Sequence, residues 1–416
     1  MKPQWELSQF VLGMAAGATA VLVMGLFSEW TKRKLWISEP LAALLFGILL
    51  GPVGLGILRP AEWPGAKGLL WEASSLTLAV GLMDVALRVG RFPLERWRGV
   101  LLLLILMMAC MWAVSSLVVW LVAGASAWVA LLLGGVVTAT DPVVANAIVT
   151  GETAERNLPR RLRHAISSES GANDGLAYAF VMLPVLMMKG ADSSAFGEWV
   201  VRVILWEVGV ATVVGAAMGL LAARMLLFAE RKGSIMRSSF LAYSIALAIA
   251  AIGVTRLLGT DGVLGTFAAG LAFSVTVSGA DRSSEESVEE VVNKFFFLPV
   301  FLMLGVMLPW GEWGRLGWRA PVLAAAILAF RRLPAMLALW PLMRVIGSRR
   351  EALFAGWFAP IGVSAIFYAL LAERRTGDSR AWVFGSLIVA ASLLAHGASA
   401  TPLTRFYGSR SGGAVT

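Results

Sequence analysis

Long apolar stretches, separated by short polar breaks, follow one another along nearly the whole chain. A helix that crosses a membrane needs about 20 mostly apolar residues, and the pattern predicts about 13 such helices. Their expected positions are 8–29, 36–59, 69–90, 99–124, 127–149, 162–188, 199–228, 237–257, 260–278, 291–309, 319–346, 351–372 and 382–404. Because the breaks leave no room for a soluble domain, we expect an all-α polytopic membrane protein in which residues 1–416 form one transmembrane unit.

Composition supports this fold class and argues against a soluble domain, a nucleic-acid-binding protein and a cysteine metal site. Hydrophobic residues make up 58% of the chain and charged residues 15%, and the mean hydropathy of +0.77 is far from that of a soluble domain. The net charge of +9 comes from basic residues in the short breaks, which is typical of membrane topology and not of nucleic-acid binding. The single cysteine, Cys110, excludes a cysteine metal site, and we expect no cofactor.

Basic residues are concentrated in alternate connections between the predicted helices. By the positive-inside rule these connections and the C-terminus are cytoplasmic, which places the N-terminus outside. The connections contain Lys32, Arg33, Lys34, Arg91, Arg96, Arg98, Arg156, Arg160, Arg161, Arg163, Arg231, Lys232, Arg237, Arg344, Arg349 and Arg350. The connection with Arg374, Arg375 and Arg380 is an exception. The expected location is a cell membrane, taken as a bacterial inner membrane.

Two predicted helices are interrupted near the middle by proline. The fifth has Thr-Ala-Thr-Asp-Pro at 138–142, and the twelfth has Trp-Phe-Ala-Pro-Ile-Gly at 357–362. A simple proline kink is one explanation for each. Paired interruptions in corresponding positions of two halves favour an ion site instead, because unwound backbone exposes carbonyls and half-helix ends.

These breaks do correspond if the chain consists of two inverted repeats. The first repeat would cover about 8–188 and the second about 237–404, with the helix at 199–228 as the link. The fold class is then a pair of inverted repeats with crossed discontinuous helices 5 and 12.

Polar residues at membrane depth gather beside the first break. Asp174 and Ser170 are four residues apart and therefore share one helix face. Thr140 and Asp141 lie where Pro142 prevents regular helix, so their oxygens are free to face inward. Hard oxygen ligands suit a cation such as Na⁺. We expect Asp174 to hold a proton and a cation in turn, and this competition is sufficient for exchange.

Two neighbours of this site are predicted to support it. Glu169 needs a buried cationic partner, and Arg332 in the predicted helix 319–346 can supply one as a structural salt bridge. The amide of Asn173 has both donor and acceptor groups and is expected to tie the two broken helices together.

Two further acidic residues lie in apolar segments. Asp84 either contributes to the ion site or pairs with Arg88, one helical turn away, and we favour the pair. Glu207 lies in the predicted helix 199–228, where a charge is costly, and the sequence identifies no partner for it.

The double motif Thr140-Asp141-Pro142 and Glu169-Ser170-Gly-Ala-Asn173-Asp174 resembles that of the NhaP/NHE-like family of monovalent cation:proton antiporters. Weaker stretches that agree are Gly47-Ile-Leu-Leu-Gly-Pro52, Gly262-Val-Leu-Gly-Thr-Phe-Ala-Ala-Gly270, Pro299-Val-Phe-Leu-Met-Leu-Gly305 and Arg332-Leu-Pro-Ala. The chain departs from the family at Val80, where an acid is often found, and at Ile361, where an Arg often follows the proline.

The resemblance implies a secondary antiporter, with a cation site of Asp174, Ser170, Asp141 and the Thr140 backbone and a buried Glu169–Arg332 pair. It also implies electroneutral exchange of Na⁺, or of K⁺ or Li⁺, for one proton by elevator-like alternating access. The expected partners are these ions, membrane lipid and a second copy of the chain.

Three other classes share some of these features. A sodium-coupled organic anion symporter can have the same repeat plan, but it should show extra polar residues for its substrate. An intramembrane aspartyl protease could use Asp141 and Asp174, yet it would leave Ser170, Asn173 and the paired breaks without a role. A passive channel would carry current without proton coupling.

Overall fold

The computed structural model describes residues 4–30, 38–63, 65–89, 97–141, 144–145, 151–190, 193–232, 240–277, 292–343 and 346–410. Throughout these ranges the regular structure is helical, which confirms the predicted class. The helices that begin the chain are α1 Gln4–Trp30, α2 Glu39–Leu50, α3 Ala66–Val89, α4 Trp97–Ala123, α5 Ala127–Val136, α7 Gly151–Asn157, α8 Arg160–Lys189 and α9 Ser193–Glu198. They are followed by the π-helical segment η4 Trp199–Val210, then α10 Ala211–Arg231, α11 Phe240–Leu257 and α12 Gly262–Thr276.

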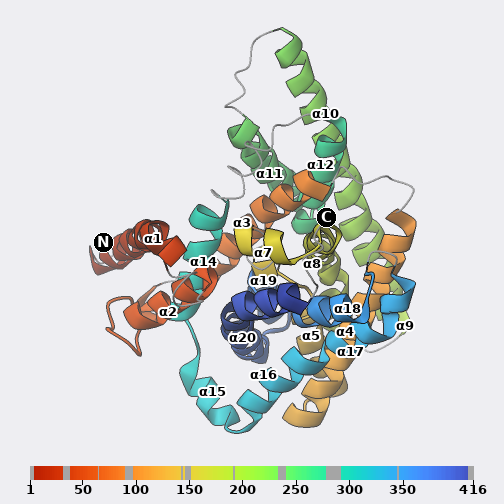
Figure 1. The fold of residues 1–416 in the computed structure, drawn as a ribbon. Helices are drawn as coiled ribbons and strands as arrows, with labels where there is room; N and C mark the ends of the chain where they lie inside the picture. Colours follow the sequence, from red (N-terminus) through yellow and green to blue (C-terminus); the bar gives the residue numbers. More distant parts are fainter. Residues whose placement is uncertain are drawn as a thin grey trace.

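The last third of the chain is also helical. Its elements are η6 Val292–Phe297, α14 Leu298–Val306, α15 Trp310–Leu316, α16 Arg319–Phe330, α17 Leu333–Leu339, η7 Trp340–Leu342, α18 Arg349–Trp357, α19 Val363–Thr376 and α20 Arg380–Arg410. In Figure 1, α5, α8 and α19 lie in the middle of the molecule, and α1, α2 and α14 lie at one side. The central position of α19 agrees with its burial, since every residue from Val363 to Ala372 is buried.

Seven helices in the described ranges are long and apolar enough to cross a membrane, and a pair bent by 63° at residues 307–309 would make an eighth. Shorter apolar helices lie at Val11–Val23, Glu39–Leu50, Ala127–Val136 and Gly262–Thr276. The predicted number of 13 is therefore not confirmed. The short helices include α5, which is interrupted at the position that the sequence predicts.

Both predicted interruptions are present. Helix α5 ends at Val136 and residues 137–141 are not helical, whereas Pro142 itself lies outside the described residues. Helix α18 ends at Trp357, residues 358–362 are not helical, and α19 begins at Val363. Proline without an amide hydrogen and glycine without a side chain account for the second break, because neither favours a continuous helix.

Two predicted boundaries are wrong. The second helix was expected to reach residue 59, but α2 ends at Leu50 and the chain turns back, with Leu55 N–H donating to the Leu49 carbonyl at 2.6 Å. A side chain at Gly54 would place its Cβ 2.2 Å from that carbonyl oxygen, so the turn needs glycine there. The predicted helix 319–346 is divided at residues 331–332, and Pro334 lies in the first turn of the new helix α17.

Close backbone contacts hold α12 against α10. A Cβ on Gly215 would lie 2.0 Å from the Gly265 carbonyl oxygen, and one on Gly219 would lie 2.0 Å from that of Ala269. Helices pack this closely in membranes where small residues let the backbones approach. The contact fixes the start of α12, which is capped by Asp261, beside the end of η4.

Candidate ion-binding site

The two chain breaks meet at Asp141. Its N–H donates to the Pro360 carbonyl at 2.8 Å, and its carboxylate accepts from the N–H groups of Val363 at 2.5 Å and Val144 at 3.0 Å. Val363 is the first residue of α19, so the carboxylate lies at the positive end of that helix dipole. A Cβ at Gly362 would lie 2.2 Å from Asp141 Oδ2, and this contact requires the glycine.

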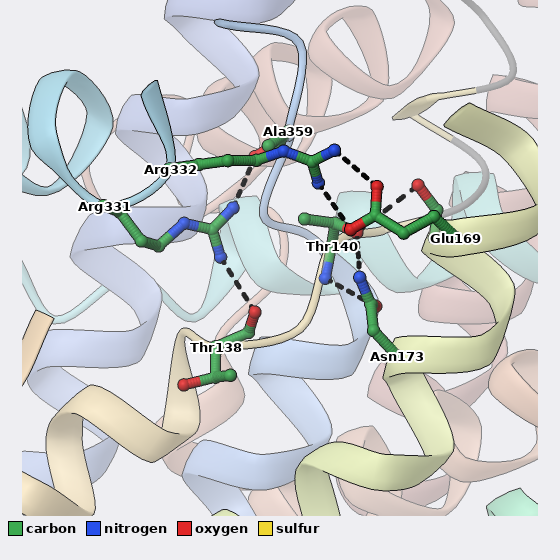
Figure 2. A network of polar contacts seen from close by, with 8 residues as sticks. Thr138, Thr140, Glu169, Asn173, Arg331, Arg332 and Ala359 are labelled. Atoms are coloured by element: carbon green, nitrogen blue, oxygen red, sulfur yellow. Dashed lines mark hydrogen bonds and ion pairs between the residues drawn. The ribbon is translucent and has the colours of Figure 1, made fainter. Parts of the chain in front are cut away.

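Arg331 binds backbone carbonyl groups in both of these breaks. Its Nη1 donates to the carbonyls of Val137, of Ala139 at 2.9 Å and of Thr138 at 3.3 Å, and its Nη2 donates to that of Ala359 at 2.6 Å. Figure 2 shows this guanidinium between the two segments. It is buried and supplies donors to carbonyls that the breaks leave without helical partners.

Arg331 is a site residue that the sequence analysis missed. The sequence has Ile at 361, where an Arg often follows the proline, and of the adjacent Arg331 and Arg332 only Arg332 was predicted to have a partner. Two adjacent arginines in one apolar segment were the available signal, because each buried charge needs its own compensation.

Arg332 lies beside Glu169 of α8. Both guanidinium Nη atoms donate to this carboxylate, Nη1 to Oε1 at 2.9 Å and Nη2 to Oε2. The Arg332 side chain is 3% exposed and that of Glu169 is 21% exposed. The two-point contact of Figure 2 thus joins α8 to the division between α16 and α17, in the arrangement that the sequence predicts.

Asn173 connects α8 to the first break. Its Oδ1 accepts from the Thr140 N–H at 3.0 Å, and its Nδ2 donates to Thr140 Oγ1 at 2.5 Å. The Thr140 hydroxyl in turn donates to Ser170 Oγ at 3.3 Å. The structure therefore brings Thr140, Ser170 and Asn173 into direct contact, and Figure 2 shows Asn173 beside Thr140.

Asp174 differs from its neighbours because its charge has no direct compensation. The residue is 0% exposed, and neither carboxylate oxygen has a hydrogen-bond partner in the part of the chain that the structure describes. Asp141 is close enough to repel it, and the Ser364 hydroxyl is beside it without forming a hydrogen bond in this structure. A buried ionised carboxylate in this state costs several kcal/mol, so the site is suited to a proton or a cation.

Ser364 is a second candidate that the sequence analysis missed. It follows Gly362 by two residues and so lies in the first turn of α19. This turn is near the crossing, which is the point at Asp141 where the two chain breaks meet. On the other side of the break, Ser392 of α20 accepts from Ile361 N–H at 2.8 Å, and His396 contacts the Trp357 carbonyl at 2.9 Å. Helix α20 thus supplies hydrogen-bond partners for the non-helical backbone of the second break.

The other two acidic residues that the sequence singles out, Asp84 and Glu207, have partners. Asp84 accepts from Arg88 Nη2 at 2.5 Å on the same helix, α3, which is the pair favoured by the sequence. Glu207 accepts from the Tyr178 hydroxyl at 2.8 Å and from Arg202 Nε at 3.3 Å. Neither of these partners of Glu207 was predicted from the sequence.

Comparison with known proteins agrees with this geometry. A family model described as sodium/hydrogen exchanger, transmembrane, matches residues 18–406. Na⁺/H⁺ antiporter 2 of Zygosaccharomyces rouxii is 35% identical over 362 residues, covering 85% of this chain and 45% of the relative. The Na⁺/H⁺ antiporter of Saccharomyces cerevisiae is 34% identical over 379 residues, covering 89% and 38%. The chain therefore spans less than half the length of these two relatives.

A solved structure shows the same fold. The sodium proton antiporter of Methanocaldococcus jannaschii, at pH 8, superposes with a TM-score of 0.70 and 16% identity, covering 96% of this chain and 98% of that chain. Similar proteins come from fungi, a plant and a bacterium, so the comparisons give no support to a bacterial inner membrane in particular. They do support an integral multi-pass membrane protein. The family model matches residues 18–406, and the helical architecture and the crossed chain breaks agree with that match. The chain therefore belongs to the sodium/hydrogen exchanger family.

Proposed function

We propose that this chain exchanges a monovalent alkali cation, Na⁺ before K⁺ or Li⁺, for a proton across the membrane. The observation that carries the proposal is the buried Asp174 carboxylate, whose two oxygens have no hydrogen-bond partner among the described residues. The names of the fungal relatives, which are Na⁺/H⁺ antiporters, support the same activity.

The oxygens around Asp174 provide further ligands. Thr140 and Ser170 are in contact through their hydroxyls, and Ser364 lies beside the carboxylate. Both oxygens of Asp141 already accept a backbone N–H, so we assign Asp141 a weaker share of the cation than Asp174. Hard neutral oxygens around a single free carboxylate favour a hard monovalent ion.

Competition at Asp174 couples the two fluxes. With a proton bound, the carboxyl group is neutral and attracts no cation; with a cation bound, its oxygens are occupied. Because both forms of the loaded site carry the same charge, exchange is one cation for one proton and electroneutral. A voltage-sensitive dye in proteoliposomes with a Na⁺ gradient should therefore show no signal, and a sodium-dependent signal would contradict this stoichiometry.

We further propose elevator-like alternating access in a homodimer built from two inverted repeats, with the N-terminus outside and the C-terminus cytoplasmic. The crossing, with its many bonds between the two breaks, forms the moving part together with α8 and α19. A short chemical cross-link between the two breaks should leave exchange intact, whereas one between α8 and α12 should stop it. Loss of exchange in both would contradict the elevator proposal.

The central test is Asp174→Asn. An amide cannot release a proton, so cation-driven proton movement in a vesicle dequenching assay should disappear for Na⁺, Li⁺ and K⁺ at every pH. Glu351→Gln is the matched control, because Glu351 is also buried but is paired with Arg161 at 2.7 Å, away from the crossing. Retained exchange by Asp174→Asn, in protein that elutes as a folded species, would refute the assignment.

A further inference from the structure

A second pair of buried carboxylates lies away from the crossing. Asp261 and Glu207 are each 4% exposed. Their backbones are in contact, because the Asp261 N–H donates to the Glu207 carbonyl at 2.9 Å, and their side-chain charges repel one another. The contact between α10 and α12 fixes this geometry, since it places the start of α12 beside η4.

The oxygens of the two carboxylates are unevenly satisfied. Asp261 Oδ1 caps α12 by accepting from the N–H groups of Val263 at 2.9 Å and Leu264 at 3.3 Å. Both oxygens of Glu207 accept side-chain hydrogen bonds. The remaining oxygen, Asp261 Oδ2, is buried and has no partner within the described ranges. A bare carboxylate oxygen next to a second carboxylate requires another positive charge.

The charged and titratable groups around the pair do not supply enough positive charge. Near it are Arg202 of η4, Tyr178 of α8, Tyr368 of α19 and Arg256 of α11, while the exposed Arg375 of α19 acts on Tyr178. Arg202 bonds Glu207 with a side chain that is 52% exposed, and it is shared with Glu198. Arg256 is bound to Glu72 at 2.8 Å. One guanidinium at the rim therefore serves two buried carboxylates.

Hydroxyl groups lie between this pair and the ion site. Tyr178, which donates to Glu207, is one helical turn from Asp174 along α8, on the same face. The Tyr368 hydroxyl donates to the Asp174 carbonyl at 2.5 Å and is close to Tyr178 and Asp261. The polar groups thus continue from Asp174 past Tyr178 to the exposed Arg202.

We propose that Asp261 and Glu207 share one proton and form a second proton-binding site between Asp174 and the end of α8 at Lys189. The proton neutralises one of the two carboxylates, and the other keeps its bonds to Tyr178 and to Arg202, which is shared with Glu198. A proton needs only the bare Asp261 Oδ2, whereas an alkali cation needs several oxygens to replace its water shell, and the other three carboxylate oxygens are already hydrogen bonded. The role of this site in transport rests on the proposed exchange, whereas the presence of the shared proton is independent of that proposal.

Infrared spectroscopy tests the proton directly. Purified Asp174→Asn protein, which lacks the carboxyl group of the ion site, should show at neutral pH the C=O stretching band of a protonated carboxylic acid, shifted in D₂O. Adding Asp261→Asn should remove this band, because Glu207 alone is compensated by Arg202 and Tyr178. Adding Glu351→Gln should leave it unchanged. A band that survives Asp261→Asn, or that is absent from Asp174→Asn, would overturn the proposal.

Asparagine is the suitable replacement because its side-chain oxygen caps a helix as well as that of aspartate. Serine is also a preferred N-cap residue, so Asp261→Ser keeps the cap with a hydroxyl group. It serves as a second variant in case Asp261→Asn does not fold. In exchange assays, Asp261→Asn and Asp261→Ser in a chain that keeps Asp174 should each leave the KM for Na⁺ within about twofold and flatten the pH profile of the maximal rate, because the cation still binds at Asp174. A raised KM with an unchanged pH profile would contradict a proton-binding role. Exchange that persists in Asp174→Asn would refute the ion site while leaving the infrared result valid.

Discussion

Removing one member of the Glu169–Arg332 pair should destabilise the protein more than removing both. Breaking a buried ion pair costs about 3–5 kcal/mol, because it leaves an uncompensated charge, whereas replacing both members by apolar residues is close to neutral. Arg332 is 3% exposed and Glu169 is 21% exposed, so an orphaned Glu169 can reach some water and an orphaned Arg332 cannot.

These exposures give an order to the expected losses. Arg332→Met should cost about 3 kcal/mol, and Glu169→Met about 5 kcal/mol, the lower and upper ends of the range. The double variant should return to within about 1–2 kcal/mol of the original protein. Methionine suits both positions because it is unbranched and fits the space of either long side chain.

The assay is thermal unfolding in detergent at one fixed scan rate, with all four proteins of the double-mutant cycle measured side by side. With about 1 °C of melting temperature per kcal/mol for a chain of 416 residues, the expected decreases are about 3 °C for Arg332→Met and about 6 °C for Glu169→Met. If the double variant loses the sum of both single losses, the pair has no coupling energy and the argument from orphaned charge is refuted.

The other predictions concern the crossing and one surface loop. Arg331→Met should lower the melting temperature and abolish exchange, because it removes the donors to four backbone carbonyls, while Arg331→Lys should recover part of the stability; equal effects of both would contradict the need for a fork of donors. Gly362→Ala should abolish Na⁺-driven proton movement, since its Cβ would overlap Asp141, and normal transport would show that the contact can relax. In the loop before α20, hydrogen bonds from Arg380 hold the pKa of Asp378 below its ordinary value. The stability from this pair is therefore present above about pH 3.9 and is lost as pH falls through the lowered pKa, so Asp378→Asn should cost less than about 1 kcal/mol at neutral pH and nothing in strong acid, as followed by unfolding at several pH values.

Proline and glycine made the positions of the two breaks predictable. Their effect on the backbone is local, so the interruptions at 138–142 and 357–362 could be inferred from the sequence without knowing the fold. The salt bridge of Glu169 could be inferred for a different reason: a charge in an apolar segment needs a partner, and few arginines were available at membrane depth.

Contacts that depend on how separate helices meet could not be found in this way. Arg331 binds backbone carbonyls, which every residue has, so no sequence pattern indicates its partners. Glu207 is satisfied by Tyr178 from another helix, and an apolar segment gives no sign of which face a tyrosine occupies. The end of α2 was placed too late because the residues after Leu50 remain apolar although the chain turns.

One guanidinium bonded to both chain breaks has a mechanical consequence. Arg331 acts as a strut: it holds the end of α5 and the end of α18 at a fixed separation, so neither half-helix can shift alone without losing several hydrogen bonds in a dry interior. The breaks expose backbone N–H and carbonyl groups, but they do not act as hinges. Flexibility has to come from the surfaces around this rigid piece, so under the proposed alternating access the ion site would keep its shape on either side of the membrane.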